Sequence, residues 1–151
     1  MEMLNLRETH ENNETKLLGD HGERLAVDFL IRRGYRIVCC NFTVPIGRNM
    51  RGAAVTGEID IIALDGEVLC FVEVKTRSSE DFSSPLSAVD LRKQRQISRT
   101  ARVYRRIFGV GSMEYRFDAV SVVLGEPPRI EHHKNFWNES RFSRKNWDRQ
   151  F

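Results

Sequence analysis

The sequence predicts an α/β fold in which helices cover a mixed β-sheet. The strongest observation is the stretch Val68–Arg77, which is apolar on both faces through Val72, as in a strand that is buried on both sides. Two stretches with apolar residues at helical spacing, residues 16–33 and 84–108, lie before and after a group of extended segments. This alternation predicts helices packed on a sheet, and 151 residues suffice for one domain with a single core.

The expected elements are, in chain order, a helix over residues 16–33, strands over 35–42, 58–64 and 68–77, a helix over 84–108, and strands over 115–124 and 129–133. Gly34 is a plausible end for the first helix, and Asp65-Gly66 predicts a hairpin that makes the second and third strands antiparallel. Ser84 and Pro85 suit the cap and first turn of the long helix. Residues 43–56 contain two glycines and a proline, so we expect a loop there.

Composition argues against several classes of protein. No apolar run approaches the roughly 20 residues of a membrane-spanning helix, and residues 1–15 are too polar for a secretory signal. The three cysteines, Cys39, Cys40 and Cys70, form no CxxC spacing, which argues against a zinc cluster or a disulfide framework. We therefore expect a cytoplasmic protein with no membrane partner, in which Cys70 is a core residue.

Charge is distributed unevenly along the chain. Residues 85–108 contain seven basic residues and one acid, a net charge of +6, whereas residues 42–84 contain four basic residues and seven acids, a net charge of −3. A basic surface beside an acidic cluster suits a protein that binds a polyanion and holds cations. An ordinary solvated helix face is the alternative, but the basic run lacks interspersed acids, which favours phosphate contact. Within the run, Lys93 continues the inward apolar stripe. The residues expected to bind nucleic acid are Arg77, Lys93, Arg95, Arg99, Arg102 and Arg106.

Two acids and a lysine lie on neighbouring strands. Glu73 and Lys75 share one face of the third strand. If the hairpin before them has a two-residue turn, Asp60 falls opposite Phe71 and diagonal to Glu73, at a backbone distance of roughly 7–8 Å. A three-residue turn would pair Asp60 with Val72 and send the two acids to opposite faces, and a bulge would also change the face. Both arrangements remain open from the sequence.

This constellation suits metal-assisted hydrolysis of a phosphodiester. Mg²⁺ prefers oxygen ligands, and a bound metal can lower the pKa of a water and neutralise charge on a phosphoryl group. Lys75 could hold that water or the scissile phosphate. An exposed edge-strand salt bridge is the alternative for Glu73 and Lys75. For Glu23, on the flank of the first helix, spacing alone favours a solvated charge, and Asp118 could form a structural ion pair.

Short motifs along residues 22–135 carry a resemblance to a known family. They are Gly22-Glu23, Gly34-Tyr35, Asn41-Phe42, Gly57-Glu58-Ile59-Asp60, Phe71-Val72-Glu73-Val74-Lys75-Thr76-Arg77, Lys93-Gln94-Arg95 and Arg116-Phe117-Asp118. In this order they resemble the YraN family, which is regarded as a family of bacterial endonucleases. The family looks like a branch of the restriction-endonuclease-like superfamily and is similar to archaeal Holliday-junction resolvases, which act as dimers.

The resemblance implies a three-layer fold with a central mixed β-sheet flanked by α-helices, and a site of the PD-(D/E)xK type. It implies Asp60 and Glu73 as metal ligands, Lys75 as the catalytic lysine and Glu23 as a helix-borne acid that completes the site. Two features depart from the family. The segment over residues 43–56 is longer than its usual connection, and the basic aromatic end of the chain exceeds its usual ending.

The predicted function is therefore a Mg²⁺-dependent DNA endonuclease, with Mn²⁺ as an alternative ion, that acts on branched or structured DNA and could form a homodimer. One alternative is a non-catalytic nucleic-acid-binding module of a DNA repair, recombination or uptake complex. Another is a protein-interaction subunit that uses Trp137 and Trp147 in the tail. For that tail, docking of its aromatic residues on the body is the favoured interpretation. The expected organisation is a polar segment over residues 1–15, a nuclease-like domain over 16–135 and a basic aromatic tail over 136–151.

Overall fold

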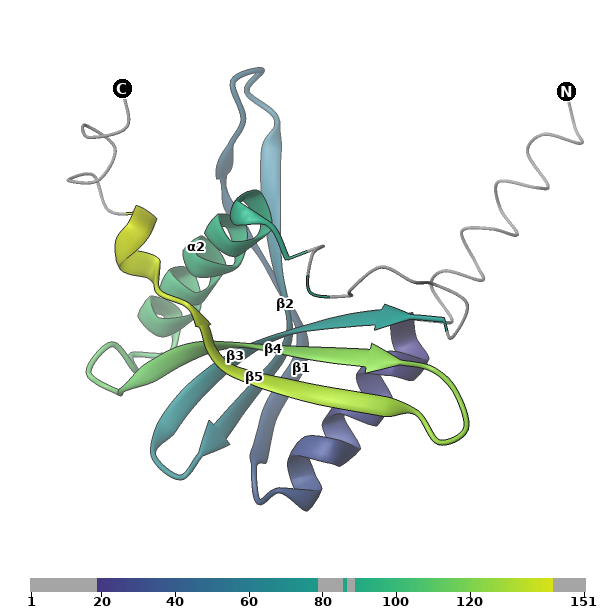
Figure 1. Ribbon diagram of the computed structural model, residues 1–151. Helices are drawn as coiled ribbons and strands as arrows, with labels where there is room; N and C mark the ends of the chain where they lie inside the picture. Colours follow the sequence, from purple (N-terminus) through teal and green to yellow (C-terminus); the bar gives the residue numbers. More distant parts are fainter. Residues whose placement is uncertain (1–18, 79–85, 87–88, 143–151) are drawn as a thin grey trace, which may run out of the picture.

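Five strands form one mixed sheet in the computed structural model, which describes residues 19–78, 86 and 89–142 (Figure 1). The strands are β1 (Arg36–Arg48), β2 (Ala54–Asp65), β3 (Val68–Arg77), β4 (Tyr115–Val123) and β5 (Arg129–Trp137). They lie side by side in chain order, and neighbours are antiparallel except β3 and β4, which are parallel. A short 3-10 helix, η2 (Glu139–Phe142), follows β5.

A helix covers each face of this sheet (Figure 1). The N-terminal helix, described over residues 19–32, packs Ala26 and Leu30 against one face. The helix α2 (Leu91–Ile107) packs Ile97 and Tyr104 against the other. In β3, Val72 belongs to the first core layer and Phe71 to the second, so both faces of this strand are buried as predicted. The structure confirms the α/β fold, in a three-layer arrangement consistent with the restriction-endonuclease-like fold.

The hairpin between β2 and β3 turns one residue later than predicted. Asp65 pairs with Val68, and Gly66, with a φ of 59°, takes the first of the two turn positions. Phe71 therefore pairs with residue 62, and the prediction that Asp60 lies opposite Phe71 is wrong. Continued beyond its last pair, the observed register sets Asp60 opposite Glu73.

Strands β1 and β2 continue beyond the sheet as a projecting hairpin, residues 43–57 (Figure 1). Their pairing runs to Arg48 and Ala54, with a bulge between Pro45 and Gly47. Gly47 and Gly52 have positive φ values of 142° and 79°, at the bulge and in the turn. The prediction of a loop over residues 43–56 is therefore wrong, because these glycines interrupt the sequence pattern without ending the ladder of hydrogen bonds.

Two other boundaries differ from the prediction. Helix α2 begins at Leu91, where the Asp90 side chain accepts a hydrogen bond from Lys93 N at 2.9 Å, so it does not open at Ser84, which lies outside the described residues. Strand β5 continues to Trp137, which is buried and stacks on Phe117. For Trp137 the docking interpretation of the tail is confirmed, whereas residues 143–151 lie outside the described part. Within the described ranges, no helix is both long and apolar enough to cross a membrane.

Candidate active site

Glu73 is a buried carboxylate near the end of β3. Its side chain is 3% exposed, and its Oε1 lies 3.2 Å from Lys75 Nζ and 3.7 Å from Lys93 Nζ. Lys93 approaches from α2, which agrees with its predicted inward position on that helix. The second oxygen, Oε2, is buried and has no hydrogen-bond partner among the described residues. Two ammonium groups thus compensate one oxygen of Glu73, while the other is left without a donor.

Asp60 lies where β2 and β3 separate. The last pair between these strands is Ile61 with Val72, and beyond it Asp60 Oδ2 accepts a hydrogen bond from Val74 N at 2.8 Å. The carboxylate therefore replaces a backbone carbonyl as the partner of β3 and lies between the two strands. Ile59 and Ile61, two positions apart, pack in opposite core layers, so the strict alternation of β2 breaks at Asp60.

Glu23 reaches the same place from the N-terminal helix. A Cβ at Gly22 would lie 1.8 Å from Thr76 Oγ1, so glycine allows the helix to approach β3 closely at this point. The Glu23 carboxyl then lies within hydrogen-bonding reach of Asn41 and Asp60. Sequence analysis gave Asn41 no role of its own. Its signal is an asparagine inside the strand expected over residues 35–42, and it has a left-handed φ of 53°.

Glu23, Asp60 and Glu73 make up the acidic cluster, and two of its members, Glu23 and Glu73, have raised pKa values. Burial, and then the charge of Asp60, raises the pKa of Glu73 to about 8, although Lys93 and Lys75 oppose the shift. Burial, and then Asp60, raises the pKa of Glu23 to about 7, while the hydrogen bond with Asn41 opposes it. A cation between these carboxyls would relieve both the repulsion and part of the cost of burial.

The donors of the acidic cluster fit a hard cation such as Mg²⁺. All three side chains offer oxygen, and the buried Glu73 Oε2 has no competing donor among the described residues. In the part of the chain that the structure describes, no group of three His, Cys, Asp or Glu side chains is placed so that it could hold a metal ion. Mg²⁺ commonly binds through one or two carboxylates and keeps several waters. Asp60 and Glu73 together provide the two carboxylates that such a site needs.

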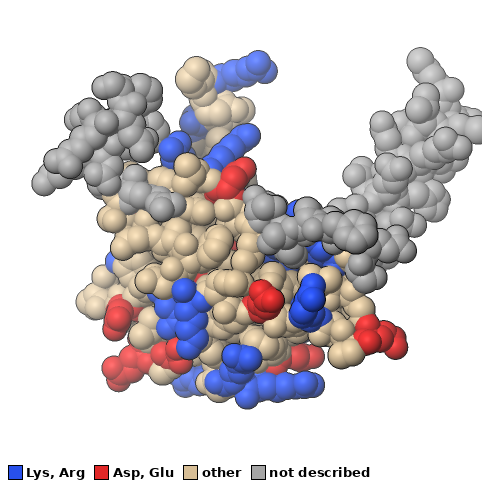
Figure 2. Space-filling view, in the orientation of Figure 1, with Lys and Arg blue, Asp and Glu red and all other residues tan. Residues whose placement is uncertain are grey.

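The exposed face of α2 carries a basic stripe, made up of Arg92, Arg95, Arg99, Arg102 and Arg106. Arg99 Nη2 donates to the carbonyl of Ile46 in the projecting hairpin at 2.6 Å, and the Arg95 guanidinium lies 5.6 Å from the centre of the Phe142 ring. The outward positions predicted for Arg95, Arg99, Arg102 and Arg106 are confirmed, and nucleic-acid binding by them stays a prediction. In Figure 2, basic side chains gather on the projecting hairpin and near its base.

Arg77 lies apart from the basic stripe, at the end of β3. It is partly buried, and its Nη1 donates to the carbonyl of Thr76 at 3.2 Å. The structure thus brings Glu23, Asp60 and Glu73 together with two lysines, while Arg77 belongs to a different element from the other predicted nucleic-acid-binding residues.

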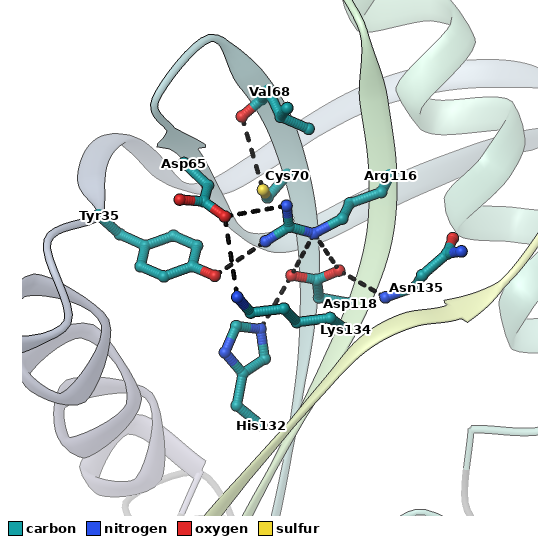
Figure 3. A network of polar contacts seen from close by, with 9 residues as sticks. All are labelled: Tyr35, Asp65, Val68, Cys70, Arg116, Asp118, His132, Lys134 and Asn135. Carbon is teal, nitrogen blue, oxygen red and sulfur yellow. Dashed lines mark hydrogen bonds and ion pairs between the residues drawn. The ribbon is translucent and has the colours of Figure 1, made fainter.

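A second buried carboxylate, Asp118 on β4, has partners on both oxygens (Figure 3). Oδ1 accepts hydrogen bonds from Arg116 Nε at 3.0 Å and from Asn135 N at 2.9 Å, and Oδ2 lies 2.8 Å from His132 Nε2. Burial alone would raise the pKa of Asp118, but the bonds with His132, Asn135 and Arg116 outweigh it, and the pKa lies below its usual value. The Asp118 network comprises Tyr35, Asp65, Arg116, Asp118, His132, Lys134 and Asn135.

The Asp118 network confirms the structural ion pair predicted for this residue. Arg116 joins Asp118 to Asp65 Oδ2 at 3.1 Å and to the Tyr35 hydroxyl at 2.8 Å, so three strands and the end of the first helix meet there. Sequence analysis missed His132, because its only visible signal was the pair His132-His133 on a strand, without a metal-ligand spacing.

Three comparisons relate the chain to known proteins. The sequence model of the Uncharacterised protein family UPF0102 matches residues 22–122. A UPF0102 protein of Alkaliphilus metalliredigens (strain QYMF) is 36% identical over 121 residues, which cover 80% of this chain and 97% of the relative. A UPF0102 protein of Solibacter usitatus (strain Ellin6076) is 46% identical over 113 residues, 75% of this chain and 80% of the relative. Among solved structures, the crystal structure of SSO0001 is 15% identical, with a TM-score of 0.36 over 97% of this chain and 70% of that one.

Proposed function

The chain belongs to the uncharacterised protein family UPF0102, the YraN family that its motifs indicate, and we propose that it is a metal-dependent endonuclease that hydrolyses phosphodiester bonds in branched or structured DNA. The family description assigns no activity, so the proposal depends on the site. The observation that carries it is Glu73, a buried carboxylate with two lysines on one oxygen and no donor on the other among the described residues.

Glu73 and Asp60 are the proposed ligands of Mg²⁺ or Mn²⁺, and Glu23 completes the site from the N-terminal helix. When bound, the cation would supply Lewis-acid stabilisation of charge on the phosphoryl group and a more acidic water. Because Glu23 and Glu73 have raised pKa values, they need this positive charge in order to ionise fully near neutral pH. Among the described residues, no donor forms a hydrogen bond with Glu73 Oε2, so no side chain supplies a positive charge directly to this oxygen.

Lys75 is the proposed catalytic lysine. Its side chain is 24% exposed, so its ammonium is reachable by a substrate phosphate while it lies 3.2 Å from Glu73 Oε1. This position suits a group that holds the scissile phosphate or the attacking water in the correct orientation. Lys93, 32% exposed and 3.7 Å from the same oxygen, provides a second ammonium from α2. Together they would offset charge that develops on the phosphoryl oxygens.

The basic stripe of α2 is the proposed contact for the DNA backbone. Its residues recur at helical spacing on the exposed face of the helix that also carries Lys93 into the site. Phosphate contacts by several arginines give strong, salt-dependent binding without sequence preference, which suits an enzyme that recognises the shape of DNA. That DNA is the partner and that the protein forms a homodimer both remain predictions. Substitutions in the basic stripe test whether the protein binds DNA.

Cleavage of a labelled four-way junction tests the proposed chemistry. With Mg²⁺ present, the protein is expected to nick the junction, and Glu73→Ala and Lys75→Ala are expected to lower the rate by about 10³-fold or more, as for removal of a principal charge-stabilising group. Glu67→Ala, which removes an exposed acid from the turn between β2 and β3, is the matched control and should cleave normally. A protein that binds the junction but leaves it uncut with Mg²⁺ and with Mn²⁺ would refute the proposal.

A non-catalytic nucleic-acid-binding module is the second candidate. It is favoured by the basic stripe and by the lack of a preformed metal centre among the described residues. In that case Arg99→Ala and Arg102→Ala would weaken DNA binding and reduce its salt dependence, Asp60→Ala would leave binding unchanged, and no variant or ion would produce cleavage.

A further inference from the structure

The projecting hairpin, residues 43–57, has no part in the chemistry described above. We propose that it is a DNA-binding arm, whose tip inserts the Met50 side chain between neighbouring bases while Arg48 and Arg51 contact the flanking phosphates. The identification of the partner as DNA rests on the proposed function. The shape and charge of the arm, and the hydrogen bonds that fix its turn, do not depend on that proposed function.

Met50 is the most exposed large apolar side chain in the described part of the chain. It is 104% exposed, whereas the next values are 57% for Leu91 and Phe108. Single exposed apolar residues are ordinary on protein surfaces. Met50 differs because it lies in the turn beyond the last pair of the hairpin, Arg48 with Ala54, and no described side chain covers it there. Figure 1 shows that this hairpin projects from the sheet.

The tip that carries Met50 is held in a defined shape. Asn49 Oδ1 accepts hydrogen bonds from Arg51 N and Ala53 N, each at 3.0 Å, and Asn49 N donates to the Ala53 carbonyl at 2.9 Å. Arg48 Nη1 donates to the Gly52 carbonyl at 2.7 Å across the turn. Such a turn loses little further conformational entropy on binding, so it presents Met50 as a preorganised apolar projection.

The charge of the arm suits nucleic acid. Residues 43–57 contain Arg48 and Arg51 and no acid, so the tip places a positive charge on each side of Met50. Proteins that bend or unstack DNA use this combination, in which an apolar side chain such as Met enters a base step and basic residues hold the backbone. Branched DNA favours such insertion, because bases beside a junction are already less well stacked.

Helix α2 fixes the base of the arm relative to the acidic cluster. Gln96 Nε2 donates to the Thr56 carbonyl at 3.1 Å, and Arg99 donates to the Ile46 carbonyl on the other strand. Gly57 lies so close to Thr100 that a Cβ there would be 1.9 Å from its Oγ1. Helix and arm also enclose a cavity of about 430 Å³, lined by Ile46, Val55, Arg92, Lys93 and Arg99 among others. Because Lys93 contacts Glu73 as well, one basic surface runs from the acidic cluster to the arm.

The reach of the arm predicts where insertion occurs. Strand β2 extends from Asp60 to Ala54 at about 3.3 Å per residue, so the last paired residue lies about 20 Å from Asp60 and the turn that carries Met50 lies a few ångström farther. Along a duplex this distance corresponds to about six to eight base pairs. We therefore expect the unstacked step to lie about this far from the bond that is cut.

The test uses the full chain and four-way junctions that carry 2-aminopurine, a base whose fluorescence rises when it is unstacked, at successive positions of one arm. Divalent ions are removed by chelation, so cleavage cannot contribute. The protein is expected to raise the fluorescence several-fold at one position. Met50→Ala should remove most of this rise, and Met50→Leu should retain it. Arg48→Ala with Arg51→Ala should lower the slope of log K against log[salt] by about two.

Ile31→Ala is the matched control, since it removes an exposed apolar side chain from the helix on the other face of the sheet and should leave the signal intact. Cleavage with Mg²⁺ is measured separately on the same variants. Loss of the signal in Met50→Ala, in a protein that never cleaves, would support the arm and refute the nuclease. An enzyme that cleaves but gives the same fluorescence with methionine or alanine at position 50, or gives no rise at all, would refute the arm alone.

Discussion

Glu73 and Asp118 are two buried carboxylates on adjacent strands, and they differ in the face of the sheet that they occupy, in their hydrogen-bond partners and in the direction of their pKa shifts. In the parallel pairing of β3 and β4, Asp118 lies beside Val72, one residue from Glu73, so the two acids point to opposite faces of the sheet. Both oxygens of Asp118 have partners, and its pKa is lowered. Glu73 has one oxygen without a donor among the described residues, and its pKa is raised to about 8.

This difference separates a structural carboxylate from a candidate functional one. Burying an acid without sufficient donors costs free energy, and a fold has no need to retain that cost. At Asp118 the cost is offset by Arg116, His132 and the Asn135 backbone, so the ion pair can stabilise the fold. At Glu73 the cost is only partly offset by Lys75 and Lys93, which leaves a position where an added cation would lower the free energy most.

Loss of each carboxylate gives the largest contrast. Asp118→Ala is expected to reduce the free energy of unfolding by about 3–5 kcal/mol, because it leaves Arg116 Nε and His132 Nε2 without an acceptor in the interior. Glu73→Ala is expected to change it by about 1 kcal/mol or less, since it also removes a buried carboxyl group that has too few hydrogen-bond partners. Urea unfolding at pH 7 measures both. Equal losses for the two variants would contradict the distinction.

The two acids should also give stability opposite dependences on pH. Between its ordinary pKa of 4.5 and about 8, Glu73 keeps its proton in the folded state and has lost it in the unfolded state. The folded state then binds more protons, so stability should fall as pH rises through this window, by up to a few kcal/mol. Asp118, with its lowered pKa, contributes stability above its ordinary value of 3.8 that is lost at lower pH. Unfolding measured from pH 5 to 9 should show a flatter slope for Glu73→Gln, and an unchanged slope would break the assignment.

Divalent ions should act on one acid and leave the other unaffected. Mg²⁺ at about 100 times its dissociation constant is expected to stabilise the fold by about 2.7 kcal/mol, with a larger effect at pH 8.5 than at pH 6 because protons compete for Glu73. Thermal unfolding with and without Mg²⁺ measures this. Glu73→Gln should remove the stabilisation, and Glu67→Ala should keep it. Stabilisation that persists in Glu73→Gln would mean that the ion binds elsewhere.

The smallest expected effect concerns the edge of the Asp118 network. Tyr35→Phe removes the hydroxyl that accepts a hydrogen bond from Arg116 Nη2 at 2.8 Å, while the ring stays in the core. Because Arg116 keeps Asp118 and Asp65, we expect a loss of about 1 kcal/mol in urea unfolding. A loss as large as that of Asp118→Ala would show that the network depends on every member.

Sequence analysis predicted those parts of the fold that depend on local pattern. The bounds of β3 were predicted correctly, because its apolar residues on both faces and its polar ends are local signals. Of the two arrangements left open for Asp60 and Glu73, the structure has the two carboxyls near each other, but with a register that differs from both, because a turn can take Gly66 in either of its central positions. Their roles as metal ligands remain predictions.

Features that depend on contacts distant in sequence could not be predicted from the spacing of residues, although the family resemblance did imply Glu23. The approach of Glu23 depends on the fit of Gly22 against Thr76, and the role of His132 depends on its position across from Asp118. The projecting hairpin was missed for a different reason. Its half-buried residues Val44, Ile46 and Val55 do alternate with exposed neighbours, but the proline and the two glycines among them are typical of loops and conceal this pattern.

Because β2 separates from β3 at Asp60, the projecting hairpin and the acidic cluster can change in sequence independently of each other. Beyond that point β2 is paired with β1 only. Inserting one residue into each strand of the projecting hairpin, as a cross-strand pair, would therefore lengthen the hairpin by about 3.3 Å without displacing any carboxylate. The distance between the tip of the projecting hairpin and the acidic cluster can therefore diverge among descendants of one ancestor while the acidic cluster stays the same. Homologues whose projecting hairpins differ in length by whole cross-strand pairs would show that this distance has changed during evolution.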